Sequence, residues 1–221
     1  MASYKTPGVY IEEIVKFPPS VAQVETAIPA FMGFTQIAKR KAAGDLHLKP
    51  TRITSMLEYE SYFGYAKSET AITVTVTGSD VLATGPGANR SPYLMYYSMQ
   101  MYFANGGGPC YIVSVGQYES SSPVVDIATL TTGLTAIRKE DEPTLLLFPD
   151  ATSMDPGSHT DFYALYNAAL TQCNELQDRF TIIDTFSDVE YNDGTDDFDP
   201  IEAMRNNITS EKDIAKYGAV Y

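Results

Sequence analysis

The chain has 221 residues, 44% of them hydrophobic and 19% charged. This is enough apolar material for a packed core, in one large or two small domains, and it excludes a disordered chain. The 28 acidic and 15 basic residues give a formal net charge of −13, and an acidic chain lacks the dense positive surface that nucleic-acid binding needs. No apolar run approaches the ~20 residues of a membrane-spanning helix, and two cysteines make no disulfide framework.

The charge is unevenly distributed along the chain. Residues 1–52 carry seven basic and four acidic residues, whereas residues 53–221 carry eight and 24. One interpretation is a solvated acidic surface that keeps the protein soluble. The other is a mildly basic N-terminal segment that faces an acidic surface of another copy.

Residues 1–20, MASYKTPGVYIEEIVKFPPS, are unlike the start of a self-contained domain. A short β-prone run over residues 9–15 lies between a turn signal at Pro7-Gly8 and the extended backbone that Pro18-Pro19 imposes. Such a strand has no neighbour in sequence to pair with. Its backbone groups therefore pair either with a distant strand of the same chain or, as an extended arm, with a neighbouring chain.

After this segment, helical patterns alternate with short apolar runs. Expected strands and helices, in chain order, are the strand 27–35, the helices 54–63 and 91–105, the strand 110–115, the helix 126–140, the strand 144–148, the helix 160–178 and the strand 180–186. The first helix is expected to have Thr54 or Ser55 as its N-cap and Gly64 as its C-cap. Pro92 occupies the first position of the second helix. This alternation predicts an α/β fold with a mixed, mainly parallel sheet flanked by helices.

One region breaks the alternation. Residues 69–84 alternate Thr with Val or Ile at a period of two and turn at Gly78-Ser79-Asp80, which is typical of an exposed antiparallel hairpin. The sequence therefore predicts a hairpin insertion over about residues 66–90.

Residues that could carry chemistry do not form a recognisable motif. The glycines at 106–108 follow a helix and precede a strand, whereas a phosphate-binding loop has the opposite order. His47 and His159 have no cysteine or second histidine at ligand spacing and are expected in exposed loops. Cys110 and Cys173 lie on apolar patterns typical of core residues.

Acidic residues leave two alternatives open. Asp150, after the strand 144–148, and Asp184, near the end of 180–186, are where a doubly wound enzyme places carboxylates, but Phe148-Pro149-Asp150 is equally a plain strand exit with a helix cap downstream. A calcium-binding loop of the EF-hand type has glycine at its sixth position and glutamate at its twelfth. The acidic loop 188–199 has neither. We therefore expect a mobile surface loop there, and no catalytic residue, cofactor or metal.

Five sequence blocks together resemble phage-type contractile tail sheath proteins, including the sheaths of extracellular contractile injection systems. In chain order they are TPGVYIEE at 6–13 with the FPPS spacer, TAIPAFMGFT at 26–35, ITSMLEYESYFG at 53–64, YYSMQMYFANGGGPCYIVSVG at 96–116 and PTLLLFPD at 143–150. The combination is more specific than any single block, and it covers most of the chain.

The resemblance implies a structural protein and no enzyme. Such sheaths stack as rings of six around an inner tube, attach to baseplate and terminator or cap proteins, and contract to drive the tube through a target envelope. It implies a virion tail or injection particle assembled in the host cytoplasm, without nucleic acid or membrane partners. It also implies an inter-subunit arm within residues 1–20 that comprises Pro7, Gly8, Val9, Tyr10, Ile11, Glu12, Glu13, Ile14, Pro18 and Pro19.

The chain departs from the family pattern at its C-terminal end. It ends with AKYGAVY at 215–221, where the family leads into a C-terminal region that carries the sheet receiving a neighbour's arm. We therefore expect an arm at 1–20 and a core domain at 21–221, without that region. A sheath-like cap or adaptor of the same machine and an α/β enzyme are the alternatives.

Overall fold

The computed structural model describes most of the chain after the predicted arm. The described residues are 27–70, 72–85, 87, 90–118, 125–154, 158–186 and 199–221. Residues 1–20, with every predicted arm residue, and residues 188–198 of the acidic loop lie outside them.

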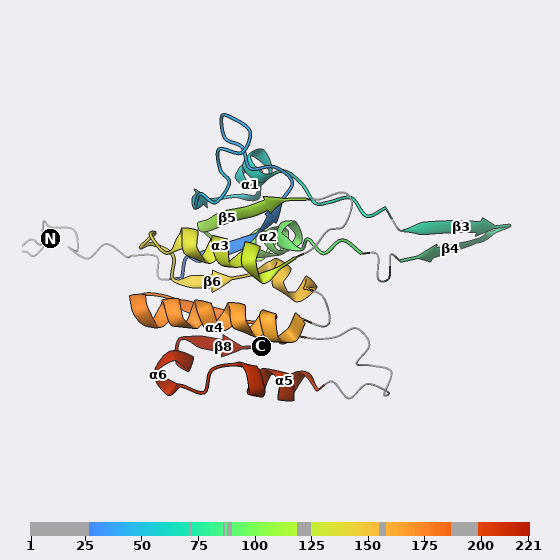
Figure 1. Cartoon of the computed structure of the whole chain (residues 1–221). Helices are drawn as coiled ribbons and strands as arrows, with labels where there is room; N and C mark the ends of the chain where they lie inside the picture. The colour runs from blue at the N-terminus through green and yellow to red at the C-terminus, as the bar shows by residue number, and fades with distance from the viewer. Residues whose placement is uncertain are drawn as a thin grey trace, which may run out of the picture.

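A six-stranded sheet in the order β2-β5-β1-β6-β7-β8 forms the centre of the molecule (Figure 1). In chain order the strands are β1 (Pro29–Thr35), β2 (Thr51–Ile53), β5 (Cys110–Gln117), β6 (Leu145–Leu147), β7 (Phe180–Ile183) and β8 (Gly218–Val220). β2 is antiparallel to β5, and the other pairings are parallel. The predicted α/β class with a mixed, mainly parallel sheet is therefore confirmed.

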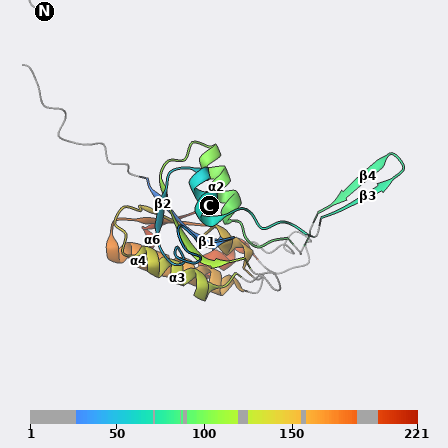
Figure 2. The same ribbon diagram turned by 90° about the horizontal axis from the view of Figure 1, so that it is seen from above.

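Helices cover both faces of this sheet. They are α1 (Met56–Phe63), α2 (Met95–Ala104), α3 (Ile127–Ile137), α4 (His159–Leu176), α5 (Pro200–Asn207) and α6 (Lys212–Ala215), with a short 3₁₀ helix, η2 (Pro149–Ser153). α3 and α4 pack on one face and α1 and α2 on the other (Figure 2), while α5 and α6 pack against α4. None of the described helices is long and apolar enough to cross a membrane.

The central strand β1 shows why the sequence forms this sheet. All seven residues of PAFMGFT are buried, because strands flank β1 on both sides and helices cover both faces. Ala30, Met32 and Phe34 join the core beneath α3 and α4. Phe31 joins the core beneath α1 and α2. Pro29 occupies the first position of the strand, where a missing N–H is tolerated.

The hairpin is present as predicted, in strands β3 (Thr73–Thr77) and β4 (Asp80–Thr84). The two strands pair with each other and not with the six-stranded sheet. Both views show the hairpin projecting away from the body (Figures 1 and 2).

Some element boundaries differ from the expectation. α2 begins at Met95 rather than at Pro92, because the Asp150 carboxylate caps the amides of Leu94 and Met95 and thereby fixes the first helical turn. His159 is the half-buried first residue of α4 and faces the Phe186 ring, so it is not an exposed loop residue. β2, α5, α6 and β8 were not predicted.

Arg179 joins the end of α3 to the start of β7. Its side chain is fully buried, and its guanidinium donates to the carbonyl oxygens of Ile137 and Glu140 at 3.3 and 2.7 Å. Ile137 is the last residue of α3, and its carbonyl also accepts the N–H of Glu140 at 3.1 Å, whereas the Glu140 carbonyl lies just beyond the helix. The neighbouring Asp178 carboxylate, 2.7 Å away, balances the charge.

We expect Arg179→Met to lower the free energy of unfolding by about 2–3 kcal/mol, because it removes the hydrogen bonds that a buried guanidinium donates to two backbone carbonyls. The matched control is Arg138→Met. Arg138 pairs with Glu175 at 2.7 Å, and both side chains are roughly half exposed, so its loss should cost under about 1 kcal/mol. Denaturant titration of both variants measures the difference, and equal losses would contradict the capping role.

Candidate functional site

The residues with candidate chemistry do not converge in the structure. Cys110 belongs to the core beneath α1 and α2, whereas Cys173 belongs to the core beneath α3 and α4, so the sheet separates them. Burial raises the pKa of each thiol to about 12, which leaves both as inert core residues, as predicted. His47 is exposed in the connection before β2. No group of three potential metal ligands occurs among the described residues.

Asp150 lies where a doubly wound enzyme would place a carboxylate, but it is fully buried and committed to the backbone. One carboxylate oxygen accepts the N–H of Phe34 at 2.6 Å, and the other accepts those of Leu94 and Met95 at 2.6 and 2.9 Å. Gly33 makes this approach possible, since a Cβ there would lie 2.5 Å from the carboxylate. Asp150 therefore joins β1 to the start of α2, and it is not placed to reach a substrate.

Burial raises the pKa of Asp150 from 3.8 to about 6, while the hydrogen bonds from the three amides oppose that rise. Asp184, the second candidate carboxylate, is half-buried and accepts the hydroxyl of Tyr166 at 3.2 Å. Burial raises its pKa as well. Each carboxylate thus has a protein partner, and neither faces the pockets described below.

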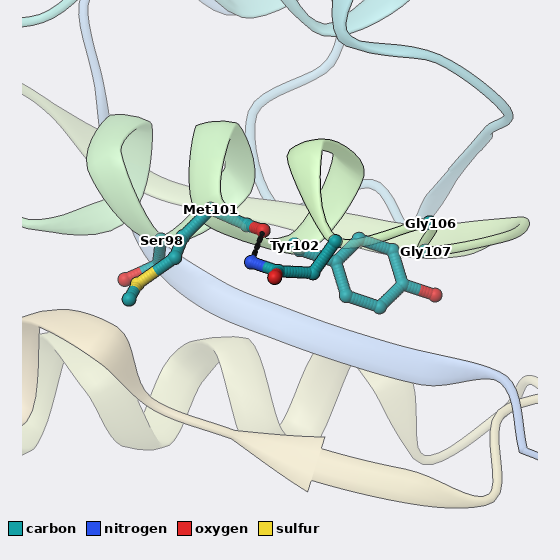
Figure 3. Close-up of a pocket in the computed structure, with 6 residues that line it drawn as sticks. Ser98, Met101, Tyr102, Gly106 and Gly107 are labelled. Carbon is teal, nitrogen blue, oxygen red and sulfur yellow. Dashed lines mark hydrogen bonds between the residues drawn. The ribbon is translucent and has the colours of Figure 1, made fainter.

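Two hollows on the described surface differ in their chemistry. The first lies at the C-terminal end of α2, has a volume of about 430 Å³ and is lined by Ser98, Met101, Tyr102, Asn105, Gly106 and Gly107 (Figure 3). The second, of about 590 Å³, is lined mostly by polar residues around the connection to β2 and includes Arg40, Lys41 and Lys49. The α2 hollow carries no charged side chain, which distinguishes it from the second hollow.

The glycines that follow α2 shape the first hollow. Gly106 adopts a positive φ of 84°, and its N–H bonds to the carbonyl of Phe103. At Gly107 a Cβ would lie 2.5 Å from the Tyr102 ring, so the ring rests directly on the backbone. The run that resembles a phosphate loop in composition is therefore a helix stop that supports an aromatic ring.

Exposed apolar side chains gather on the hairpin and on the surface of α2. The hairpin exposes Ile72, Val74, Val76, Val81 and Leu82, and the α2 surface exposes Tyr97 and Met101. Large exposed apolar groups that cluster mark interaction surfaces more often than chance. The alternation of Thr with Val or Ile in residues 69–84 predicts the exposed hairpin, whereas no motif in the sequence predicts the hollow.

No protein-family model and no curated protein matches the chain. Among solved structures, it is similar to the helical sheath of the anti-feeding prophage in its contracted state, solved by cryo-electron microscopy. The two are 26% identical, with a TM-score of 0.46, over 84% of this chain. The match covers 41% of the sheath chain, so this chain corresponds to about two fifths of its length.

We expect Asp150→Asn to destabilise the protein by about 1–3 kcal/mol, because one amide hydrogen that the carboxylate accepts will then face an NH₂ group. Asp141→Asn, at an exposed position, is the control and should change stability by less than about 0.5 kcal/mol. Chemical denaturation near neutral pH measures both. An Asp150→Asn variant as stable as the control would contradict the tie between β1 and α2.

The raised pKa of Asp150 also predicts a pH dependence. The carboxyl titrates near 3.8 when unfolded and near 6 when folded, so between these values the folded protein holds the extra proton. The stabilisation is complete below 3.8 and is lost as the pH rises through 6. The stability of the wild type relative to Asp150→Asn should therefore fall as the pH rises over this range. Denaturation of both proteins from pH 4 to 7 measures it, and a pH-independent difference would contradict the assignment.

Proposed function

We propose that the chain is a structural subunit of a contractile sheath that polymerises around an inner tube and contracts to drive the tube through a target envelope. The observation that carries this proposal is the place of the sheath-like sequence blocks in the fold. Block 26–35 contains β1, block 96–116 contains most of α2 and most of β5, and block 143–150 contains β6 and Asp150.

These blocks are distant in sequence but adjacent in space. β5, β1 and β6 are consecutive strands of the sheet, and Asp150 from the third block binds β1 in the first and the start of α2. The resemblance therefore falls on one physical unit, the centre of the sheet with its cap. Scattered chance matches would not be expected to meet in this way.

The partners follow from this proposal. Other copies of the chain would form stacked rings of six, with an inner tube protein inside and baseplate and terminator or cap proteins at the ends. The particle would be a phage tail or a contractile injection system, assembled in the host cytoplasm. In this scheme residues 1–20 form an arm, and residues 21–221 form the core domain with its hairpin insertion at about 66–90.

The proposed arm would link neighbouring subunits through strand addition. Main-chain hydrogen bonds provide affinity in this mode, and alternate side chains provide specificity. Val9, Tyr10, Ile11 and Ile14 would be the docking residues, while Pro7-Gly8 and Pro18-Pro19 would let the arm leave its own domain. The enzyme alternative is less well supported, because Asp150, its best candidate carboxylate, is enclosed by backbone amides.

We expect that deletion of residues 1–20 will leave the fold intact and abolish assembly in the protein as its native source makes it. Particles isolated through this protein and viewed by negative-stain electron microscopy should be hollow, cross-striated tubes for the wild type. The deletion should yield none, with an unchanged circular dichroism spectrum.

Point variants test whether assembly depends on the docking side chains of the arm or only on the presence of residues 1–20. Val9→Asp with Ile11→Asp should abolish the tubes as the deletion does, because two charges would enter an apolar docking site. Glu13→Gln is the matched control and should leave them. Normal tubes from the deletion variant would refute the arm, and the absence of tubes in every wild-type preparation would refute the sheath.

A further inference from the structure

The β3–β4 hairpin has one aliphatic face. Its register places Val74 opposite Ala83 and Val76 opposite Val81. Because side chains alternate along a strand, these four residues and Ile72 lie on the same face. The opposite face carries Thr73, Thr75 and Thr77 with Leu82.

No described residue of the same chain covers this face. Val74, Val76 and Val81 are 61%, 65% and 68% exposed, and all residues from 72 to 85 are exposed. An isolated two-stranded hairpin is marginally stable in water. A partner that covers the aliphatic face would therefore stabilise the hairpin as well as bind it.

The α2 hollow has matching chemistry. Its lining combines the Met101 side chain, which is 65% exposed, with the ring of Tyr102 and the backbone of Gly106 and Gly107. Figure 3 shows Met101 and Ser98 side by side at one end of the hollow and the Tyr102 ring at the other. A methionine can adapt to aliphatic groups of different shape, so this surface suits a row of valines.

The hairpin and the hollow lie at opposite ends of the sheet. The hairpin leaves from the carboxyl ends of the parallel strands, where the N–H of Tyr65 bonds to Gln36 after β1 and that of Leu94 bonds to Asp150 after β6. The hollow lies at the other end of α2, before the chain enters β5 at Cys110. The hairpin projects away from it (Figure 1), so the hairpin of one copy does not reach the hollow of the same copy.

Charge favours a second copy at these two surfaces. The chain carries a net charge of −13, so copies repel one another over most approaches. Asp80 is the only charged residue from 72 to 85, and the hollow has no charged lining residue. Contact between them therefore brings two copies together with little like-charge repulsion.

We propose that the aliphatic face of the hairpin of one copy docks on the α2 hollow of a second copy. The inference rests on the proposed assembly function in taking another copy as the partner. Two different surfaces meet, so the contact is head-to-tail, and such contacts propagate into rings or helical arrays rather than closing as pairs.

The area involved makes each contact weak by itself. Two strands of five residues are ~17 Å long, so one face is much smaller than the ~800 Å² per partner of a stable interface. The contact gains strength only where other contacts hold the same copies together. Covalent capture is therefore the appropriate test.

The experiment mixes two full-chain variants, Val76→Cys on the hairpin and Ser98→Cys in the hollow, at millimolar concentration with a short bifunctional maleimide. One variant carries an affinity tag, so that the mixed dimer has its own mass. The native thiols are buried and unreactive. We expect a mixed dimer in clear excess over the mixture of Val76→Cys with Ile201→Cys, an exposed position on α5.

A second pair of variants tests the chemistry of the contact. Met101→Gln added to the Ser98→Cys chain should lower the mixed-dimer yield severalfold, whereas Thr75→Ser added to the Val76→Cys chain, on the opposite face of the hairpin, should not. Circular dichroism of each variant confirms that the body remains folded.

The outcomes are distinct. Val76→Cys homodimers without the mixed dimer would mean that hairpins pair symmetrically, and this would overturn the proposal. No cross-link, or equal yields with Ile201→Cys, would overturn it too. Sheath tubes are scored separately by electron microscopy, so intact tubes without this cross-link leave the sheath proposal standing, and the cross-link without tubes leaves the contact standing.

Discussion

The carboxylate of Asp150 is the interaction on which the centre of the molecule depends. β6 pairs with β1 only over Pro29–Phe31, and beyond it the N–H of Phe34 has the carboxylate as its acceptor. The same group accepts the first amides of α2, where the helix dipole also favours a negative charge. Burial of a carboxylate is costly, and these charge-assisted hydrogen bonds offset part of that cost.

Local patterns in the sequence predict the elements they form, whereas a long-range contact such as that of the Asp150 carboxylate is not visible in them. Apolar patterns located the central strands, α4 and the hairpin, because their periodicities are local. The bond from Asp150 to Phe34 spans 116 residues, and no local pattern reveals it, so α2 was expected to start at Pro92. β2, α6 and β8 have three or four residues each, too few for a period to emerge.

The same contrast between local and long-range causes applies to the glycines. Gly64 was predicted as the cap of α1, and its positive φ of 82° with an N–H bond to Glu60 confirms this. The need for Gly33 arises only from the approach of Asp150, and that for Gly107 only from the Tyr102 ring. A glycine that ends a local element is therefore readable from sequence, whereas one that admits a distant side chain becomes intelligible only in the folded chain.

Asp150 also connects the core to the two exposed apolar surfaces. The chain returns from the hairpin to Leu94, whose amide the carboxylate binds, and α2 then runs from this point to the hollow. The buried Asp150 carboxylate therefore holds the start of α2, the helix that lies between the base of the hairpin and the hollow. If subunits are linked by arms as proposed, a small hairpin contact would be weak enough to break and re-form while the arms hold. This division of roles would let such a lattice change its packing without releasing its subunits.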